Sequence, residues 1–160
     1  QTATPPGVQA VPLLTLDEVA VLPAGHALAA QAVLQVQDFA NQPFVSLSAD
    51  DPYRRQIDAR FAEAGVARQL HLQTHSAVAV CAMVQQGLGL AIVNPLTALA
   101  MAGSGLVVRR LGFSVPFSIN ALLPLYRPAL PEAQPLLQSL EAQAQEVTAA
   151  LQRLLSQPAN

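Results

Sequence analysis

Short apolar runs alternate with helical segments through the middle of this 160-residue chain. Four runs are rich in β-branched and aliphatic residues and are bounded by turn residues, which is typical of β-strands. They cover residues 44–48, 68–74, 88–94 and 106–113. A strand that is followed by a helix and a second strand normally returns through a right-handed crossover and lies parallel in the same sheet. The alternation therefore predicts an α/β fold with a parallel sheet.

The helices between these strands begin and end at recognisable signals. Asp51 before Pro52 is typical of an N-cap followed by proline at the first helical position, and Gly65 is a suitable C-cap. Ser76 is expected to cap a second helix that ends at Gly87. The inward face of that helix would carry Ala77, Val80, Cys81 and Val84, and a third helix would run from Pro95 to about Ala102.

Residues outside the alternating region also show local patterns. Strands are expected at 8–14, 18–23 and 117–126, and a short helix is expected near 36–40. A long amphipathic helix is expected from Pro131 to about Leu155, because apolar residues recur there near helical spacing. Those residues are Leu137, Leu140, Ala144, Val147, Leu151 and Leu154.

The composition excludes several classes of protein. Hydrophobic residues make up 52% of the chain and charged residues 11%, which is too apolar for a disordered chain. Eight Lys and Arg against ten Asp and Glu cannot supply the basic face of a nucleic-acid binder. The single cysteine, Cys81, excludes an internal disulfide and a cysteine-only metal site. No apolar run reaches the ~18 residues of a membrane helix. No secretion signal is visible, so we expect a cytoplasmic protein.

Polar residues gather where three of the expected strands end. Ligands of open α/β sheets bind beyond the carboxyl ends of strands, at helix N-termini. The three turns contribute Ser46, Ser48, Asp50 and Asp51, then Thr74, His75 and Ser76, and then Asn94. A helix N-terminus suits a carboxylate, and two aspartates could hold an ammonium group. The turns together predict a site for a zwitterionic amino acid, although Asp51 and Ser76 would also cap their helices.

Three other functions are weaker interpretations of the same residues. His75 beside Ser76 suggests a hydrolase, but adjacent residues rarely align for proton transfer, and no G-x-S-x-G elbow is present. His71 and His75 lack the glutamate of a zinc helix, and His71 falls in an expected strand. Gly87 and Gly89 follow a helix, whereas a dinucleotide loop follows a strand. We therefore expect no enzyme activity, no cofactor and no metal.

Several longer segments resemble the effector-binding domain of LysR-type transcriptional regulators. One is the stretch SLSADDPYRRQIDARFAEAGV, and others are THSA, VCAMV, VNPLTA and SGLVVRR. The earlier VPLLTLDEVAVLPAGHALA is similar to the family's P-L-L…V-x-V-L-P-x-G-H-x-L-A segment. The resemblance extends roughly from Pro6 to Leu155. Because the chain begins with Gln1, we expect it to be a piece of a longer protein.

The resemblance implies a two-lobe domain like that of periplasmic binding proteins. Lobe I would be partial, from residues 1–41 and 127–160, and lobe II would be complete, from residues 42–126. The family's winged helix-turn-helix is absent from this chain, so DNA would be bound only by the missing N-terminal part. The effector between the lobes would be diaminopimelate or lysine, and the protein would control lysine biosynthesis.

The resemblance also implies effector contacts and an assembly. The matching positions are Ser46, Ser48, Thr74, His75, Ser76 and Asn94, and a basic ligand would also be contacted by Asp50 and Asp51. Arg54 could counter the aspartates, but a solvated salt bridge in the first helical turn is the preferred interpretation. The protein would be a homodimer or homotetramer. An amino-acid solute-binding protein of the periplasmic type is the alternative, because the same lobes would serve it.

Overall fold

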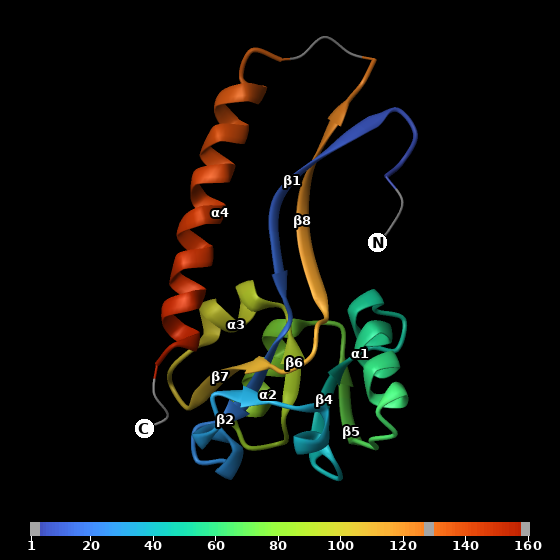
Figure 1. Cartoon of the computed structure of the whole chain (residues 1–160), viewed down its shortest axis with the longest axis vertical. Helices are drawn as coiled ribbons and strands as arrows, with labels where there is room; N and C mark the ends of the chain where they lie inside the picture. The colour runs from blue at the N-terminus through green and yellow to red at the C-terminus, as the bar shows by residue number, and fades with distance from the viewer. Residues whose placement is uncertain (1–3, 127–129, 158–160) are drawn as a thin grey trace.

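The computed structural model describes residues 4–126 and 130–157. A body of sheet and helices lies at one end, and a two-stranded ribbon and a long helix extend from it in the same direction (Figure 1). The body contains strands and helices in alternation, as the sequence predicts. The α/β fold class is therefore confirmed.

The body is built on two groups of strands. Four strands form one sheet in the order β3-β7-β2-β6, and β4 pairs with β5 in parallel. A parallel bridge between Phe44 and Leu90 joins β4 to the start of β6. The strands are β2 (Val19–Pro23), β3 (Val33–Leu34), β4 (Pro43–Leu47), β5 (Gln69–Thr74), β6 (Ala91–Val93) and β7 (Leu106–Leu111).

The four strands of the alternating region, β4, β5, β6 and β7, run in the same direction, as the sequence predicts, and β2 adds an antiparallel strand from outside that region. β2 lies between β6 and β7 and runs antiparallel to both. Strand–helix alternation fixes the direction of β4, β5, β6 and β7 only, and β2 comes from before that region. The first residue of β2 consequently lies at the same edge of the sheet as the carboxyl ends of β4 and β6.

Helices cover both faces of the body. One face carries Ala20, Leu22, Phe44 and Ile92, which pack against Ile57 and Phe61 of α1. The other carries Val19, Val21, Val45 and Val93, which pack against Val80 and Val84 of α2 and Ala98 of α3. The helices are α1 (Pro52–Glu63), α2 (Ala77–Gln85) and α3 (Pro95–Met101). Two short 3-10 helices, Ala27–Ala30 and Val36–Phe39, cover the turns before β4, and the second confirms the helix expected near residues 36–40.

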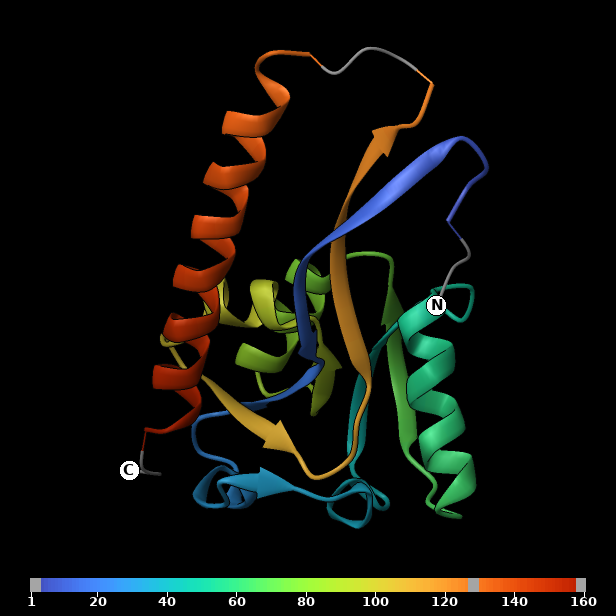
Figure 2. The ribbon, with the colours of Figure 1, turned by 45° about the horizontal axis from the view of Figure 1, so that its top comes forward.

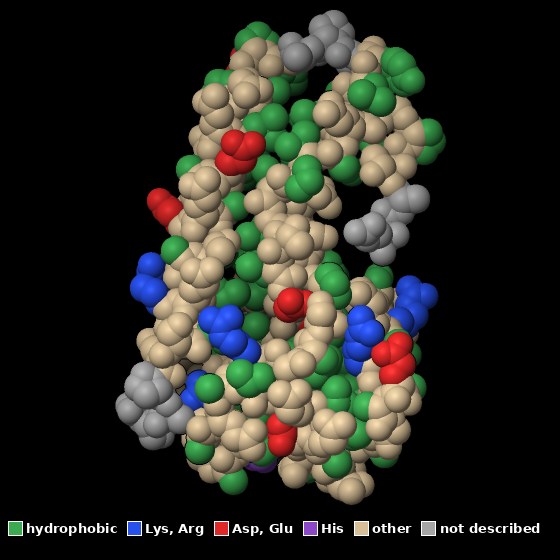
Figure 3. Space-filling view, in the orientation of Figure 1, with side chains coloured by type: hydrophobic (Ala, Val, Ile, Leu, Met, Phe, Trp, Pro, Cys, Tyr) green, Lys and Arg blue, Asp and Glu red, His purple; other side chains and the backbone are tan. Residues whose placement is uncertain are grey.

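The ribbon consists of β1 (Val8–Asp17) and β8 (Pro116–Pro124). They pair antiparallel along their whole length, from Val8 opposite Pro124 to Asp17 opposite Pro116. The long helix α4 (Ala133–Leu155) runs beside them (Figure 2). Only its last turns pack on the body, where Leu151 is buried. Hydrophobic side chains line the hollow between α4 and the ribbon (Figure 3).

The sheet crosses the lobe boundary expected at residue 42. β2 and β3 lie before that boundary, yet they share a sheet with β6 and β7, which lie after it. β8 leaves the body and pairs with β1 instead. The two-lobe division remains a prediction, and the observed sheet favours boundaries at Glu18 and Val115, where the chain enters and leaves the body. Within residues 4–126 and 130–157, no helix is both long and apolar enough to cross a membrane.

Candidate functional site

Three helices begin at one edge of the body, directly after the strands β4, β5 and β6. Each start is capped by a side chain that the sequence places in a polar turn. The Asp51 carboxylate Oδ1 accepts hydrogen bonds from the N–H groups of Tyr53 at 2.8 Å and Arg54 at 3.0 Å. Ser76 Oγ accepts from Ala79 at 3.3 Å, and Asn94 Oδ1 accepts from Thr97 at 2.8 Å. The predicted caps at Asp51 and Ser76 are confirmed.

A cavity of about 250 Å³ lies at this edge. Its walls come from the turn after β4 and the turn after β5, and they consist of Ser48, Asp50, Asp51, Pro52 and His75. The fold thus brings together two of the three turns that the sequence singles out. Two carboxylates, a hydroxyl and an imidazole line one small volume beside the N-terminus of α2, which is suited to a zwitterion.

The other sequence-predicted residues lie outside that cavity. Thr74 Oγ1 accepts a 3.4 Å hydrogen bond from the Ser76 N–H and so helps to shape the turn before α2. Asn94 caps α3. Ser46 is buried beneath the turn after β4. The part that any of them takes in binding remains a prediction.

Ser46 belongs to a buried hydrogen-bond network centred on Arg54. The Arg54 guanidinium donates to Ser46 Oγ and to the Leu47 carbonyl, both at 2.9 Å, and pairs with Asp58 at 2.8 Å. Arg68 also pairs with Asp58. The interpretation of Arg54 as a solvated salt bridge is therefore wrong, because the guanidinium lies under the turn. Its hydrogen bonds to Ser46 and Leu47 hold the turn that carries the site. These contacts join α1 to β4, so they cannot be predicted from the position of Arg54 within the helix.

Glu18 is a residue of this edge that the sequence analysis did not single out. It lies between β1 and β2 and is 1% exposed, and neither of its carboxylate oxygens has a hydrogen-bond partner within residues 4–126 and 130–157. Burial and, second, the negative charge of Asp51 raise the pKa of its carboxyl to about 8. The only signal in the sequence is an acidic residue directly before the wholly apolar run Val19–Leu22, which looks like the start of a strand.

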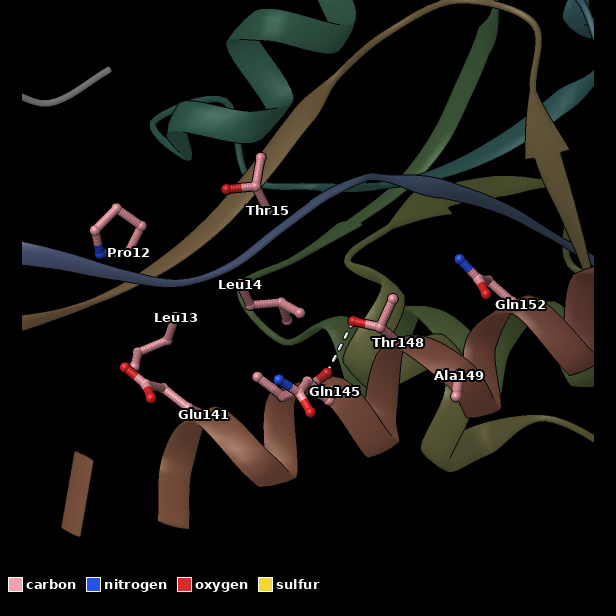
Figure 4. Close-up of a pocket in the computed structure, with 10 residues that line it drawn as sticks. Pro12, Leu13, Leu14, Thr15, Glu141, Gln145, Thr148, Ala149 and Gln152 are labelled. Atoms are coloured by element: carbon pink, nitrogen blue, oxygen red, sulfur yellow. Dashed lines mark hydrogen bonds between the residues drawn. The ribbon is translucent and has the colours of Figure 1, made fainter. Parts of the chain in front are cut away.

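A larger cavity of about 460 Å³ lies between β1 and α4. Leu14 of β1 points toward Thr148 of α4 across it (Figure 4). Its walls are Pro12, Leu13, Leu14, Thr15, Glu141, Ala144, Gln145, Thr148, Ala149 and Gln152. Glu141 is the single charged residue among them. Because this groove has neither two carboxylates nor a helix N-terminus among its lining residues, the edge of the sheet is the better candidate for an amino-acid site.

The alternatives that the sequence analysis disfavoured find no support in the geometry. The described residues contain no group of three His, Cys, Asp or Glu side chains that could hold a metal ion. Cys81 is buried, and burial raises the pKa of its thiol to about 11, so it is not a reactive thiolate. Gly87 ends α2 with φ +78°. At Gly89 an added Cβ would lie 2.7 Å from the Pro43 carbonyl oxygen, so this glycine lets β6 approach β4.

A family model described as the LysR substrate binding domain matches residues 1–145. The chain belongs to this family, whose members are ligand-binding domains of transcriptional regulators and not enzymes. It is 46% identical to the transcriptional activator protein LysR of Escherichia coli (strain K12) over 153 aligned residues. The aligned region covers 96% of this chain and 49% of the relative.

Two further similarities agree with this assignment. The regulatory protein NocR of Agrobacterium tumefaciens (strain T37) is 28% identical over 123 residues, which covers 77% of this chain and 41% of that protein. The regulatory domain of Synechocystis PCC6803 CcmR, solved in complex with 2-PG, superposes with a TM-score of 0.71 at 17% identity. That match covers 89% of this chain and 71% of the CcmR chain, and it shows a shared fold. The chain spans about half the length of the curated relatives it matches.

The burial of Glu18 predicts a pH dependence of stability. The folded state keeps the Glu18 proton up to a pH of about 8, whereas the unfolded chain loses it near 4.5. Between these values the unfolded state binds fewer protons, so the free energy of unfolding should fall as the pH rises. The slope should approach about 1.4 kcal/mol per pH unit.

Urea unfolding at several pH values measures this slope. Glu18→Gln, which cannot ionise, should make the free energy of unfolding nearly independent of pH in this range. Asp17→Asn is the matched control, because it removes an exposed carboxylate at the neighbouring position. Equal slopes in the wild type and Glu18→Gln would show that the Glu18 carboxylate is solvated or paired.

Proposed function

We propose that this domain binds an amino acid, diaminopimelate or lysine, and that the full-length protein thereby controls transcription of lysine biosynthesis. The observation that carries the proposal is the cavity in which Asp50 and Asp51 meet His75 beside the N-terminus of α2. The 46% identity to the E. coli transcriptional activator LysR supports the part of the proposal that concerns transcription.

The two ends of a zwitterion match the two turns. The first N–H groups of an α-helix have no partner within the helix, and its dipole is positive there, so the start of α2 would bind the α-carboxylate. The hydroxyls of Thr74 and Ser76 lie at the same point. Asp50 and Asp51 would hold the α-ammonium group. No proton transfer is needed, so the site would bind its ligand without changing it.

Binding would act on transcription through a population shift. The body from Glu18 to Val115 would be one lobe, and the ribbon and α4 would connect it to the other. An effector that contacts both lobes favours the closed arrangement. In the full-length protein that closure would change the spacing of winged helices on DNA. The family assignment argues against the alternative of a solute-binding protein, although both share the two-lobe design.

The protein would work as a homodimer or homotetramer. Leu122 of β8 is 54% exposed and Leu136 of α4 is 60% exposed, and both lie on elements that extend beyond the body. Apolar surface of this kind tends to become covered by association.

The first prediction concerns the ligand. Diaminopimelate or lysine should raise the melting temperature of the full-length protein in proportion to the logarithm of its concentration, because a ligand that binds only the folded state stabilises it. At a concentration of 100 times Kd the gain is about 2.7 kcal/mol. Differential scanning fluorimetry measures it. Stabilisation by an aromatic acid or a sugar, with no shift from either amino acid, would contradict the proposed ligand class.

The second prediction concerns the turn before α2. Ser76→Ala should lower the free energy of unfolding by about 1 kcal/mol through loss of the cap. It should also weaken binding by about 1.5–3 kcal/mol, because the effector carboxylate loses a donor. Thr74→Val should weaken binding with little change in stability, since Thr74 precedes the cap. Calorimetry and urea unfolding separate the two effects. If both variants bound the effector with wild-type affinity, this turn would only begin α2 and would not contact the effector.

The third prediction concerns assembly. Light scattering should show the chain as a dimer or a larger species, because the faces of β8 and α4 are uncovered. A monomer that persists over a broad concentration range would contradict this expectation.

A further inference from the structure

We infer that Glu18 receives the side-chain ammonium group of the bound amino acid. The inference rests on the proposed amino-acid function and adds a residue that determines which amino acid is accepted. It assigns Glu18 to the recognition of a cation at the far end of the ligand from the α-carboxylate.

Glu18 has no counterion in the part of the chain that the structure describes. The three ion pairs within the described residues use Asp58 and Glu63 as their acids. Glu18 is as deeply buried as the core hydrophobics, yet no described residue forms a hydrogen bond with either of its carboxyl oxygens. A buried polar group without a partner is costly, and in native structures such groups concentrate at functional sites. A cationic ligand group would supply the missing partner.

The register of the sheet places Glu18 at the edge that carries the polar turns. Val19 pairs with Val93, and the Glu18 N–H donates to the Val115 carbonyl at 2.9 Å. These contacts place Glu18 beside the end of β6, where Asn94 caps α3. Glu18 therefore lies at the same edge as the cavity lined by Ser48, Asp50, Asp51, Pro52 and His75, although it does not itself line that cavity.

The direction of the Glu18 side chain follows from its position in the chain next to β2. Successive side chains of a strand alternate between the faces of a sheet. Glu18 thus shares the face of Ala20 and Leu22, which α1 covers. Asp51 and Tyr53 lie at the start of α1. Burial and, second, the Asp51 charge raise the pKa of Glu18, and burial followed by the Glu18 charge raises the pKa of the Tyr53 phenol.

The spacing selects the side-chain ammonium rather than the α-ammonium. The α-ammonium and the α-carboxylate of an amino acid are attached to the same carbon atom. If the ligand's α-carboxylate binds at the start of α2, its α-ammonium must therefore lie near Asp50 and His75. β6 lies between β4 and β2. Glu18, at the start of β2, is therefore two strand spacings, or roughly 10 Å, from the turn after β4 that carries Asp50. An extended lysine or diaminopimelate side chain is the part of the ligand that spans such a gap. Reaching Glu18 requires a side-chain rearrangement, and the partly exposed Tyr53 is the neighbour placed to move.

Binding would also release a proton. With a pKa of about 8, Glu18 is mostly protonated at pH 7 in the free domain. An adjacent ammonium group favours the ionised form. The carboxyl proton therefore leaves to buffer as the ion pair forms, and no covalent bond changes.

The test compares lysine with norleucine, which has the same chain but ends in a methyl group. Calorimetry on the full-length protein should show that the wild type prefers lysine. Glu18→Gln should reduce this preference by about tenfold to a hundredfold, the range expected when a charge-assisted hydrogen bond is lost. Asp17→Asn is the matched control, since it removes a charge at the next position while its amide can still accept the 2.7 Å hydrogen bond from Ser114. It should leave the preference unchanged.

The second readout is the number of protons released, measured from the binding enthalpy in buffers of different ionisation enthalpy. The wild type should release close to one proton on binding lysine at pH 7, and Glu18→Gln should release none. Lysine binding with an unchanged preference and unchanged proton release in Glu18→Gln would overturn the role of Glu18 and leave the amino-acid function intact. Absence of binding by lysine, diaminopimelate and norleucine alike would instead overturn the proposed function and the inference with it.

Discussion

The antiparallel pairing of β2 between β6 and β7 is the constraint on which the site depends. Because β2 runs against its neighbours, its first residue lies at the edge where β4 and β6 end. A parallel strand in the same place would carry that residue to the opposite edge. The reversal therefore adds the Glu18 carboxylate to an edge that already holds the N-termini of α1, α2 and α3. It also makes Glu18 and Val115 the points where the chain crosses between body and ribbon.

Ionisable side chains in the body are of two kinds, those in a paired network and Glu18, which is buried without a partner among the described residues. Arg54, Asp58 and Arg68 form a network in which the Arg54 guanidinium also holds Ser46 and the Leu47 carbonyl. Arg68 stacks on Phe61 with its guanidinium carbon 4.1 Å from the ring centroid. Glu18, which lies near the start of the same helix, has no such partner among the described residues. Paired charges fix the turn after β4, whereas the buried Glu18 carboxyl, which must hold a proton, lowers stability at neutral pH. Binding sites commonly lower stability in this way.

Local signals in the sequence predicted the elements and the helix starts well. Asp51-Pro52 and Ser76 are caps because a side chain and a backbone N–H two or three residues later suffice to define them. The direction of β2 could not be predicted in this way, since it depends on pairing Ala20 with Arg109, far along the chain. Long-range packing likewise decides the burial of Arg54.

The candidate site was predicted in part. Ser48, Asp50, Asp51 and His75 were chosen from their turns, and the fold brings them to one cavity. Glu18 was missed because an acid before an apolar run looks like an ordinary strand start. Its burial follows only once α1 and Val115 are packed against it. The domain family was recognisable from short motifs spread along the chain, and the family match over residues 1–145 agrees.

The central claim is that a cationic amino acid binds across the edge of the sheet, between the turn before α2 and Glu18. A crystal structure of the full-length protein with lysine tests it most directly. The account predicts the lysine carboxylate at the N-terminus of α2, the α-ammonium near Asp50 and Asp51, and Nζ within hydrogen-bond distance of a Glu18 oxygen. Lysine bound in the groove between β1 and α4, or bound at the edge with Glu18 still buried and unpartnered, would contradict it.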